Sequence, residues 1–364
     1  MQQVRFIDSN KDRSLFFATL RKNVDNYFKE NNISKFSTPG MVFKTIVLML
    51  AYFVPFALLL ALQLSTGVQI TMWSIMGFAL AGVGMSVMHD ANHGAYSSNS
   101  QTNTIIGWSL NLLGGSVFNW KMQHNLLHHT YTNVVHMDDD IDDKLILRLS
   151  PHTEVKWYHK FQFIYAFFLY GILTIYWALM KDFIQFFKYK AEGVNTNSPA
   201  KNRMIFLKIL GAKALYFSIF LVLPLAILHL PVKPYIAGFL LMHFIAGNVL
   251  TIVFQLAHTV EHTTHPRPDE NGTIDNAWAI HQLNTTVNFS RHNKLISWYV
   301  GGLNFQVEHH LFPTICHVHY PAIAPIVKET AEQFGIPYLE NKTLLEAVGS
   351  HIRLLQRFGE PVIA

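Results

Sequence analysis

Residues 70–88 read ITMWSIMGFALAGVGMSVM, and the chain continues without a break into His89-Asp90-Ala91-Asn92-His93. An apolar run of this size approaches the length of about 20 residues that a helix needs to cross the hydrocarbon core of a bilayer. Residues four apart lie on one face of a helix, so His89 and His93 can bind one metal ion together. The junction therefore predicts a membrane helix that ends in a metal-binding pair at the water boundary.

Three other apolar runs have the length of a membrane span, and they cover residues 41–64, 214–230 and 235–257. The connectors 65–69 and 231–234 are short and contain one charge, whereas the first 40 residues and the segments after each hairpin are basic. Lys and Arg collect on the cytoplasmic side of membrane proteins. We therefore expect an all-α membrane protein with four transmembrane helices, arranged as two hairpins that enter the bilayer from the cytoplasm.

This topology divides the chain into three parts. Residues 1–40 form a cytoplasmic segment, residues 41–258 contain the hairpins, and residues 259–364 form a cytoplasmic helical cap. A fifth apolar run, 161–180, is rich in aromatic residues and flanked by lysines, so we expect it to lie in the headgroup region rather than to cross. The run 104–118 is too short and too interrupted by glycine to span.

The composition agrees with a membrane protein. Half of the 364 residues are hydrophobic, only 14% are charged, and the mean hydropathy is +0.20, against about 25% charged residues in an average soluble domain. The small excess of basic residues, 28 against 23 acidic ones, suits an anionic membrane surface, and we expect no nucleic-acid partner. The single cysteine, Cys316, excludes disulfide scaffolds and cysteine-ligated clusters within these residues.

Histidine is unusually frequent, with 20 in the chain. A second cluster contains His124, His128 and His129, and a third ends in His309-His310. His124 and His128 have the spacing that lets two histidines share one metal, and His129 points about 100 degrees away, toward a second ion. His258 lies at the end of the fourth apolar run, and His262 follows one turn later. In the four-span topology all these residues reach the same face of the membrane.

So many imidazoles exceed the needs of one structural zinc ion and indicate two ions, with positions left for oxygen or water. Imidazole binds zinc, copper, iron and nickel, and iron is the choice that can attack an unactivated C–H bond with O2. No Glu has a His three residues later, which excludes the soluble di-iron carboxylate fold. The acidic run 137–143 is expected to be a solvated loop, because it is too short for a calcium-binding loop.

The sequences HDANH, HNLLHH and QVEHH resemble the three histidine boxes of the membrane fatty acid desaturase family. The third box, Gln306-Val307-Glu308-His309-His310, is similar to that of the front-end branch, in which Gln replaces a histidine. The resemblance implies a four-helix membrane core with a cytoplasmic cap and a non-haem site for two iron ions. It also implies an O2-dependent reaction that inserts a cis double bond into a fatty acyl chain.

Carried onto this sequence, the resemblance implies eight iron ligands, which are His89, His93, His124, His128, His129, His258, His309 and His310. Gln306 stands where other members have a histidine, and its amide oxygen binds metal weakly. That leaves one coordination position open, for which His281 is a candidate, with His262 as a further residue near the site. Isolated histidines within spans, such as His243, are expected to serve packing.

The residues contain no His-Pro-Gly-Gly motif of a fused cytochrome b5 domain and no dinucleotide-binding motif. We therefore expect electrons from a separate ferredoxin, rubredoxin or cytochrome b5, and an acyl substrate attached to CoA or to a lipid. Three alternatives remain open. These are a hydroxylase, ketolase or conjugase on the same scaffold, a zinc protease built on the HxxEH pattern from His258 to His262, and a histidine-lined metal transporter.

Overall fold

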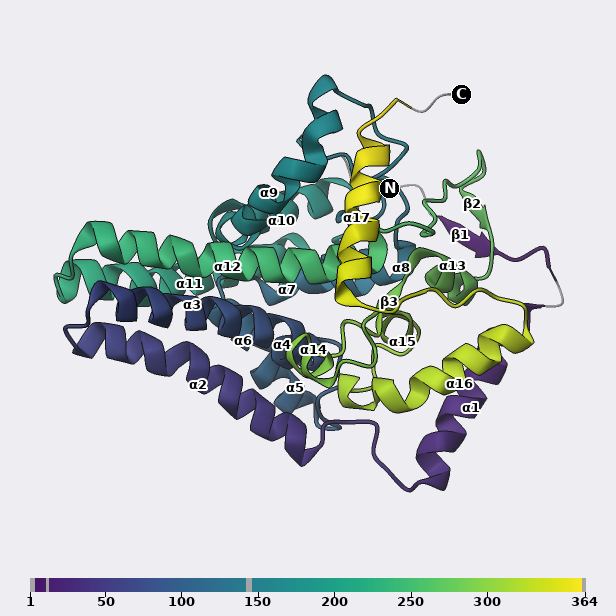
Figure 1. Cartoon of the computed structure of the whole chain (residues 1–364), viewed down its shortest axis with the longest axis horizontal. Helices are drawn as coiled ribbons and strands as arrows, with labels where there is room; N and C mark the ends of the chain where they lie inside the picture. The colour runs from purple at the N-terminus through teal and green to yellow at the C-terminus, as the bar shows by residue number, and fades with distance from the viewer. Residues whose placement is uncertain (1–3, 11–12, 142–145, 362–364) are drawn as a thin grey trace.

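The computed structural model describes residues 4–10, 13–141 and 146–361, and most of them are helical (Figure 1). Strands contribute only two short parallel pairs. One joins β1 (Arg5–Ile7) to β2 (Thr273–Asp275), and the other joins β3 (Asn288–Phe289) to β4 (Glu340–Asn341). The described residues therefore form an all-α membrane protein in the coarse sense that the sequence predicts.

The first hairpin consists of α2 (Pro39–Ala61) and α3 (Thr66–Gly82). Thr38 caps α2 through its side chain, which accepts a hydrogen bond from the backbone N–H of Met41, and Pro39 occupies the first helical position. Helix α3 continues through a π-helical segment, η2 (Val83–Val87), into α4 (Met88–Asn92). The predicted span 70–88 is thus part of one longer rod that carries the first histidine pair at its end.

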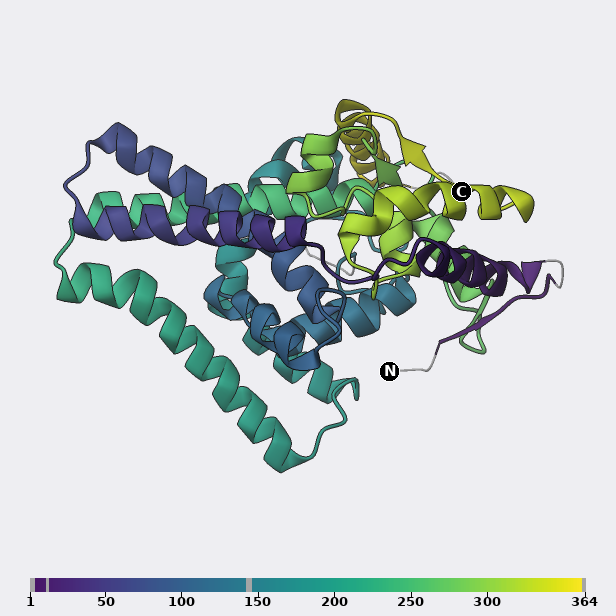
Figure 2. The same ribbon diagram turned by 90° about the horizontal axis from the view of Figure 1, so that it is seen from below.

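The second hairpin begins with α11 (Pro199–Phe217), which continues as the π-helical segment η6 (Ser218–Ile227), and returns as α12 (Val232–His258). The turns of both hairpins lie at the same end of the molecule (Figure 1), and the long rod of α11 and η6 runs obliquely to the other three (Figure 2). From the sequence, we expected this rod to begin at residue 214. The helix starts fifteen residues earlier, because Ser198 caps it and Pro199 opens it despite the charges in its first turns.

A fifth rod runs from Trp157 to Ala191 and comprises η4 (Trp157–Phe161), α9 (Gln162–Tyr176), η5 (Trp177–Lys181) and α10 (Asp182–Ala191). Helix α9 packs closely against α12. A Cβ added at Gly247 would lie 2.7 Å from the carbonyl oxygens of Tyr170 and Gly171, so only glycine permits this approach. By length and composition, five helices among the described residues can cross a membrane, one more than the sequence expectation of four.

Between the two hairpins, shorter helices support the second histidine cluster. They are α5 (Ser100–Gly107), α6 (Ser109–Leu112), α7 (Val117–Trp120), the π-helical segment η3 (Lys121–His128) and α8 (His129–Tyr131). The chain breaks between α6 and α7 at Gly114, which has a φ of +88°. The run 104–118 is therefore a chain of short helices and no span, as its glycines predict.

We call the remaining helices, α1 from the N-terminal segment and six from the described part of residues 259–364, the cap. They are α1 (Phe16–Glu30), α13 (Trp278–Thr285), α14 (Lys294–Tyr299), α15 (Gln306–Leu311), η7 (His317–His319), α16 (Tyr320–Gln333) and α17 (Leu344–Phe358). One hydrophobic cluster joins α1 to α13, α15 and α16 through residues such as Leu20, Leu283 and Val327. The segments 1–40 and 259–364, which the sequence analysis treated as separate parts, therefore share a core.

Candidate metal centre

Four histidines from three helices form a first group. His89 and His93 come from the end of the α3–α4 rod, His124 comes from η3, and His309 comes from α15. One ring nitrogen of each lies within 4.8 Å of those of the other three. The Nε2 atoms of His89 and His124 are 3.1 Å apart. The group thus joins residues that are more than 200 positions apart in the sequence.

Three fully buried histidines form a second group beside the first. His128 is the last residue of η3, His258 is the last residue of α12, and His310 lies next to His309 on α15. Their ring centroids are 4.7 to 4.9 Å apart. Each group receives one member of the His309-His310 pair, so α15 holds the two groups next to each other.

His129 lies between the two groups. Its ring centroid is 4.6 Å from that of His309 and 4.4 Å from that of His310. Its Nε2 atom is also 3.3 Å from Nε2 of His124. All eight histidines that the sequence analysis selected as ligands therefore meet at one place, and their role as ligands stays a prediction.

The structure differs from the sequence expectation at the pair His124 and His128. We expected them to share one ion as residues of an α-helix, yet each belongs to a different group. The reason is that residues 121–128 form a π-helix, whose hydrogen bonds connect residues five apart and whose turn is wider. The wider turn directs the two rings, 5.3 Å apart, toward neighbouring groups.

The nitrogens that face the centre have the chemistry of a metal site. In the eight histidines of the centre, six ring nitrogens are buried and have no hydrogen-bond partner among the described residues, and these are Nε2 of His93, His128, His258, His309 and His310 and Nδ1 of His129. A buried polar atom without a partner is costly, and such atoms are rare in native structures. Their concentration here fits a centre whose partners are metal ions rather than protein groups.

In several of these rings the other nitrogen, Nδ1, forms a hydrogen bond with a protein group. The Nδ1 atoms of His128 and His310 donate to Asp138 at 3.0 Å and to Gln282 at 2.8 Å. Nδ1 of His309 lies 3.2 Å from the hydroxyl of Tyr320. Hydrogen bonds of this kind fix the tautomer, so that Nε2 carries the lone pair that can bind a metal ion.

Burial also keeps these rings neutral. Removal from water lowers the pKa of His93, His124, His129, His309 and His310, and the neighbouring imidazoles lower it further. A neutral imidazole is the form that binds a metal ion. These five rings can thus bind cations at neutral pH without first losing protons.

His128 is the exception. Burial alone lowers the pKa of this histidine, but the charge and hydrogen bond of Asp138 outweigh burial and raise it. Asp138 is fully buried, and it also accepts a hydrogen bond from the backbone N–H of Asn133 at 3.0 Å. A carboxylate behind a ligating histidine makes the imidazole a stronger donor to a metal.

The expectation that residues 137–143 form a solvated loop is therefore wrong for the part of it that the structure describes. Asp138 and Asp139 are buried, and Asp140 accepts from the amide of Gln123 at 2.6 Å; Asp142 and Asp143 lie outside the described residues. The sequence analysis also missed Gln282 and Tyr320. For Asp138 the sequence offered one signal, an acidic residue ten positions after His128. It offered none for Gln282 and Tyr320, because their contacts join segments that are distant in the chain.

The additional residues have different positions. His281, on α13, is buried with its ring against Phe6, burial lowers its pKa to about 4, and it belongs to neither group. Gln306 is buried on α15, and its Oε1 has no hydrogen-bond partner among the described residues. His262 is exposed and has a φ of +74°, on the far side of a turn from the buried His258.

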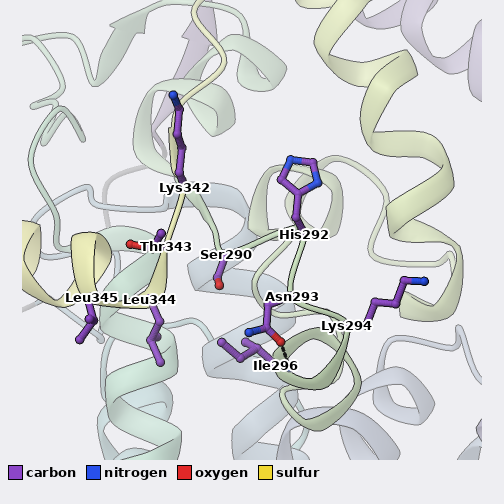
Figure 3. A pocket seen from close by; sticks show the side chains of 9 residues that line it. All are labelled: Ser290, His292, Asn293, Lys294, Ile296, Lys342, Thr343, Leu344 and Leu345. Carbon is purple, nitrogen blue, oxygen red and sulfur yellow. Dashed lines mark hydrogen bonds between the residues drawn. The ribbon is translucent and has the colours of Figure 1, made fainter.

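The position of His262 removes the support for a zinc protease. The HxxEH pattern needs both of its histidines on one ion, but His258 points into the second group while His262 faces solvent. Glu261, the proposed base in that pattern, forms an ion pair with Arg353 at 2.7 Å. A surface hollow of about 570 Å³ between α14 and the start of α17 (Figure 3) is lined by none of the grouped histidines.

Comparisons with known proteins agree on one family. Residues 67–342 match the family model described as fatty acid desaturase. The chain is 34% identical over 344 residues to an sn-1 linoleoyl-lipid 6-desaturase of Arthrospira platensis, covering 94% of this chain and 92% of that protein. It is 36% identical over 346 residues to the Synechocystis protein of the same name, covering 95% and 96%. It is also 35% identical to an acyl-lipid (8-3)-desaturase of Physcomitrium patens, covering 94% of this chain and 72% of that protein.

Proposed function

The chain belongs to the fatty acid desaturase family, and from this premise we propose that its two histidine groups bind two iron ions for an O2-dependent desaturation of a lipid-linked acyl chain. The sequence prediction of a membrane desaturase, an oxidoreductase, is confirmed by the family match and by the named relatives. The nature of the metal, the form of the substrate and the membrane topology are parts of the proposal.

The observation that carries the metal assignment is the set of partnerless nitrogens that face two adjacent centres. The first group would hold one ion and the second group the other, with His129 between them. Bound iron would supply the oxidising power, with O2, to remove one hydrogen from each of two adjacent carbons. The histidines hold the ions, while Asp138, Gln282 and Tyr320 orient the rings.

The proposed substrate follows from the relatives. Two of them are named linoleoyl-lipid 6-desaturases, and carbon 6 lies on the carboxyl side of the double bonds that a linoleoyl chain already carries. We propose the same front-end selectivity here, with the acyl chain between the membrane helices and its headgroup at the cytoplasmic face. The third histidine box with Gln306 in place of histidine agrees with that branch.

The proposed topology has four spans and places the metal centre on the cytoplasmic side. The two hairpin turns share one end of the molecule, and α9 and α10 do not extend to that end (Figure 1). The fifth rod exposes one continuous apolar stripe, which comprises Phe161, Ile164, Phe168, Ile172, Tyr176, Leu179, Met180, Ile184 and Phe187. A rod with one apolar face and flanking lysines supports a position in the headgroup region rather than a fifth crossing.

The reaction also needs two electrons, for which we propose a separate carrier protein such as a ferredoxin, rubredoxin or cytochrome b5. The sequence given has a single cysteine, so these residues cannot hold a cysteine-ligated cluster of their own. Its net charge of +5 favours association with an acidic carrier.

Expression of the chain in a host that makes linoleoyl lipids tests the proposal. Gas chromatography–mass spectrometry of double-bond derivatives should detect a new cis double bond at carbon 6, and purified protein should contain two iron ions per chain. His124→Ala should abolish the product and lower bound iron, whereas His229→Ala, at an exposed turn residue, should leave both unchanged. A hydroxylated or keto product instead would identify the alternative chemistry on the same scaffold, and zinc without iron would refute the metal assignment.

A further inference from the structure

A buried network of polar side chains lies behind the first histidine group, between α2, α4 and the cap. Asp90, next to His89, accepts a hydrogen bond from Nδ1 of His317 at 2.7 Å and from Sγ of Cys316 at 3.0 Å. On its other side the His317 ring accepts a hydrogen bond from Nζ of Lys44 at 3.1 Å. A lysine of the first span, a histidine of the cap and an aspartate of the first box thus form one chain.

Lys44 needs such partners because its ammonium group is buried. This lysine lies in the second turn of α2, and its side chain is only 2% exposed. An ammonium group removed from water is costly unless charged or hydrogen-bonding groups surround it. His317 supplies the hydrogen bond, Asp90 supplies the negative charge behind it, and the ring of Trp298 lies 5.3 Å from Nζ.

The same cap segment also reaches the third box and the linker before α2. Tyr320 places its hydroxyl 3.2 Å from Nδ1 of His309. The backbone N–H of Cys316 donates to the carbonyl of Lys35 at 2.9 Å. Residues 316–320 therefore contact the helix that carries His89 and the helix that carries His309, and both histidines belong to the first group.

Asp90, Cys316 and His317 are close enough to hold a third metal ion, but their hydrogen bonds argue against it. Both ring nitrogens of His317 and the carboxylate of Asp90 have protein partners. In the two histidine groups, by contrast, five Nε2 atoms lack such partners among the described residues. The network is thus complete without a cation, whereas the histidine centre is not.

We propose that Lys44 and His317 are positioning residues, which fix Asp90 and thereby hold the α4 histidines at the correct distance from His309. This inference rests on the proposed function, because it assigns a task to the network relative to the metal centre. A hydrophobic pair of the same shape would join α2 to the cap equally well. The directional Lys44–His317–Asp90 chain additionally sets the rotation of α4 about its axis.

Lys44→Met tests the proposal, because it removes the ammonium group and retains most of the alkyl stem. We expect about 10- to 100-fold faster loss of iron to a chelator, as is typical when groups behind metal ligands are removed. The Mössbauer spectrum of ⁵⁷Fe-loaded protein should change, with a broadened or second signal from the first-group ion. Lys44→Arg, which keeps the cation, should restore most of the retention, and Lys29→Met, at an exposed residue of α1, should behave as wild type.

If Lys44→Met does not accumulate in membranes, His317→Asn tests the same link. The Asn amide can replace Nδ1 as a donor to Asp90, but the side chain is too short to place an acceptor where Nε2 lies, so Lys44 loses this partner and the same loss of iron is expected. Wild-type iron retention and an unchanged Mössbauer spectrum in either accumulating variant would overturn the inference. Wild-type protein without iron or desaturase activity would instead contradict the proposed function, so the two failures are distinguishable.

Discussion

The partners of the histidine rings determine how each residue of the centre acts. His128 donates to a buried carboxylate, His310 to an amide oxygen of Gln282, and His258 lies with Nδ1 3.2 Å from the backbone carbonyl of Thr285. A carboxylate withdraws the ring proton more strongly than an amide oxygen does. Within the second group, His128 is therefore the strongest donor to a metal.

Asp138→Asn measures that contribution. The amide keeps the shape of the carboxylate but loses its charge, so we expect metal affinity or turnover to fall by about 10- to 100-fold. Iron per chain after dialysis against a chelator and desaturase activity are the measurements. Asp25→Asn, at an exposed residue of α1, is the control. Full iron retention in Asp138→Asn would show that the carboxylate does not support the ligand.

Gln306, the first residue of the third box, has an amide oxygen without a hydrogen-bond partner among the described residues. If this oxygen faces the metal, Gln306→His should retain more activity than Gln306→Ala, because imidazole also offers a lone pair and alanine offers none. Activity and iron content of both variants are the measurements. Equal values in the two variants would contradict a role for Gln306 at the metal.

At the scale of elements, α17 is held to the membrane helices by His351. Its Nδ1 donates to the carbonyl of Thr259 at 2.6 Å, and its Nε2 accepts from the hydroxyl of Tyr170 at 2.9 Å. Burial lowers the pKa of His351 to about 4. The ring is therefore neutral in the folded protein above about pH 4.

This shift predicts a pH dependence of stability. The unfolded chain binds a proton at His351 below a pKa of about 6.5 and the folded chain only below about 4. Stability from this group is thus present above pH 6.5 and is lost as the pH falls toward 4. The melting temperature in detergent should drop more between pH 7 and pH 5 for wild type than for His351→Phe, since every other histidine is present in both proteins. Equal drops would exclude this role.

Sequence periodicity and composition predicted the membrane rods well but not their ends. The span expected at 235–257 is the helix Val232–His258, whereas the rod expected from 214 begins at Pro199, because its first turns carry Lys201, Arg203 and Lys208. The histidine boxes and their resemblance to those of the desaturase family predicted which imidazoles meet, but the spacing did not predict that His124 and His128 belong to different groups. It could not predict Gln282, Tyr320 or Lys44, since their contacts join segments that come together only in the fold.

At the scale of the whole molecule, the topology is testable by cysteine labelling. Single cysteines at Lys160, near the start of the fifth rod, and at Thr196, after its end, report on the two ends of the rod, and one at Gln63 marks a hairpin turn; all three positions are exposed. If the rod lies at the interface, an impermeant maleimide should label positions 160 and 196 from the cytoplasmic side only and position 63 from the opposite side only. Labelling of 160 and 196 from opposite sides would show that the rod crosses, and buried Cys316 provides the unlabelled background.

Helix α12 extends over 27 residues from the distant turn to its final residue, His258. One alanine inserted anywhere along it would advance that ring by about 1.5 Å and turn it by about 100 degrees, away from His128 and His310. The length of this helix consequently sets the distance between the hairpin turn and the histidine centre. The length of α12 can change only by whole helical turns, because any other change rotates His258. The hairpin of α2 and α3 must then change by the same distance.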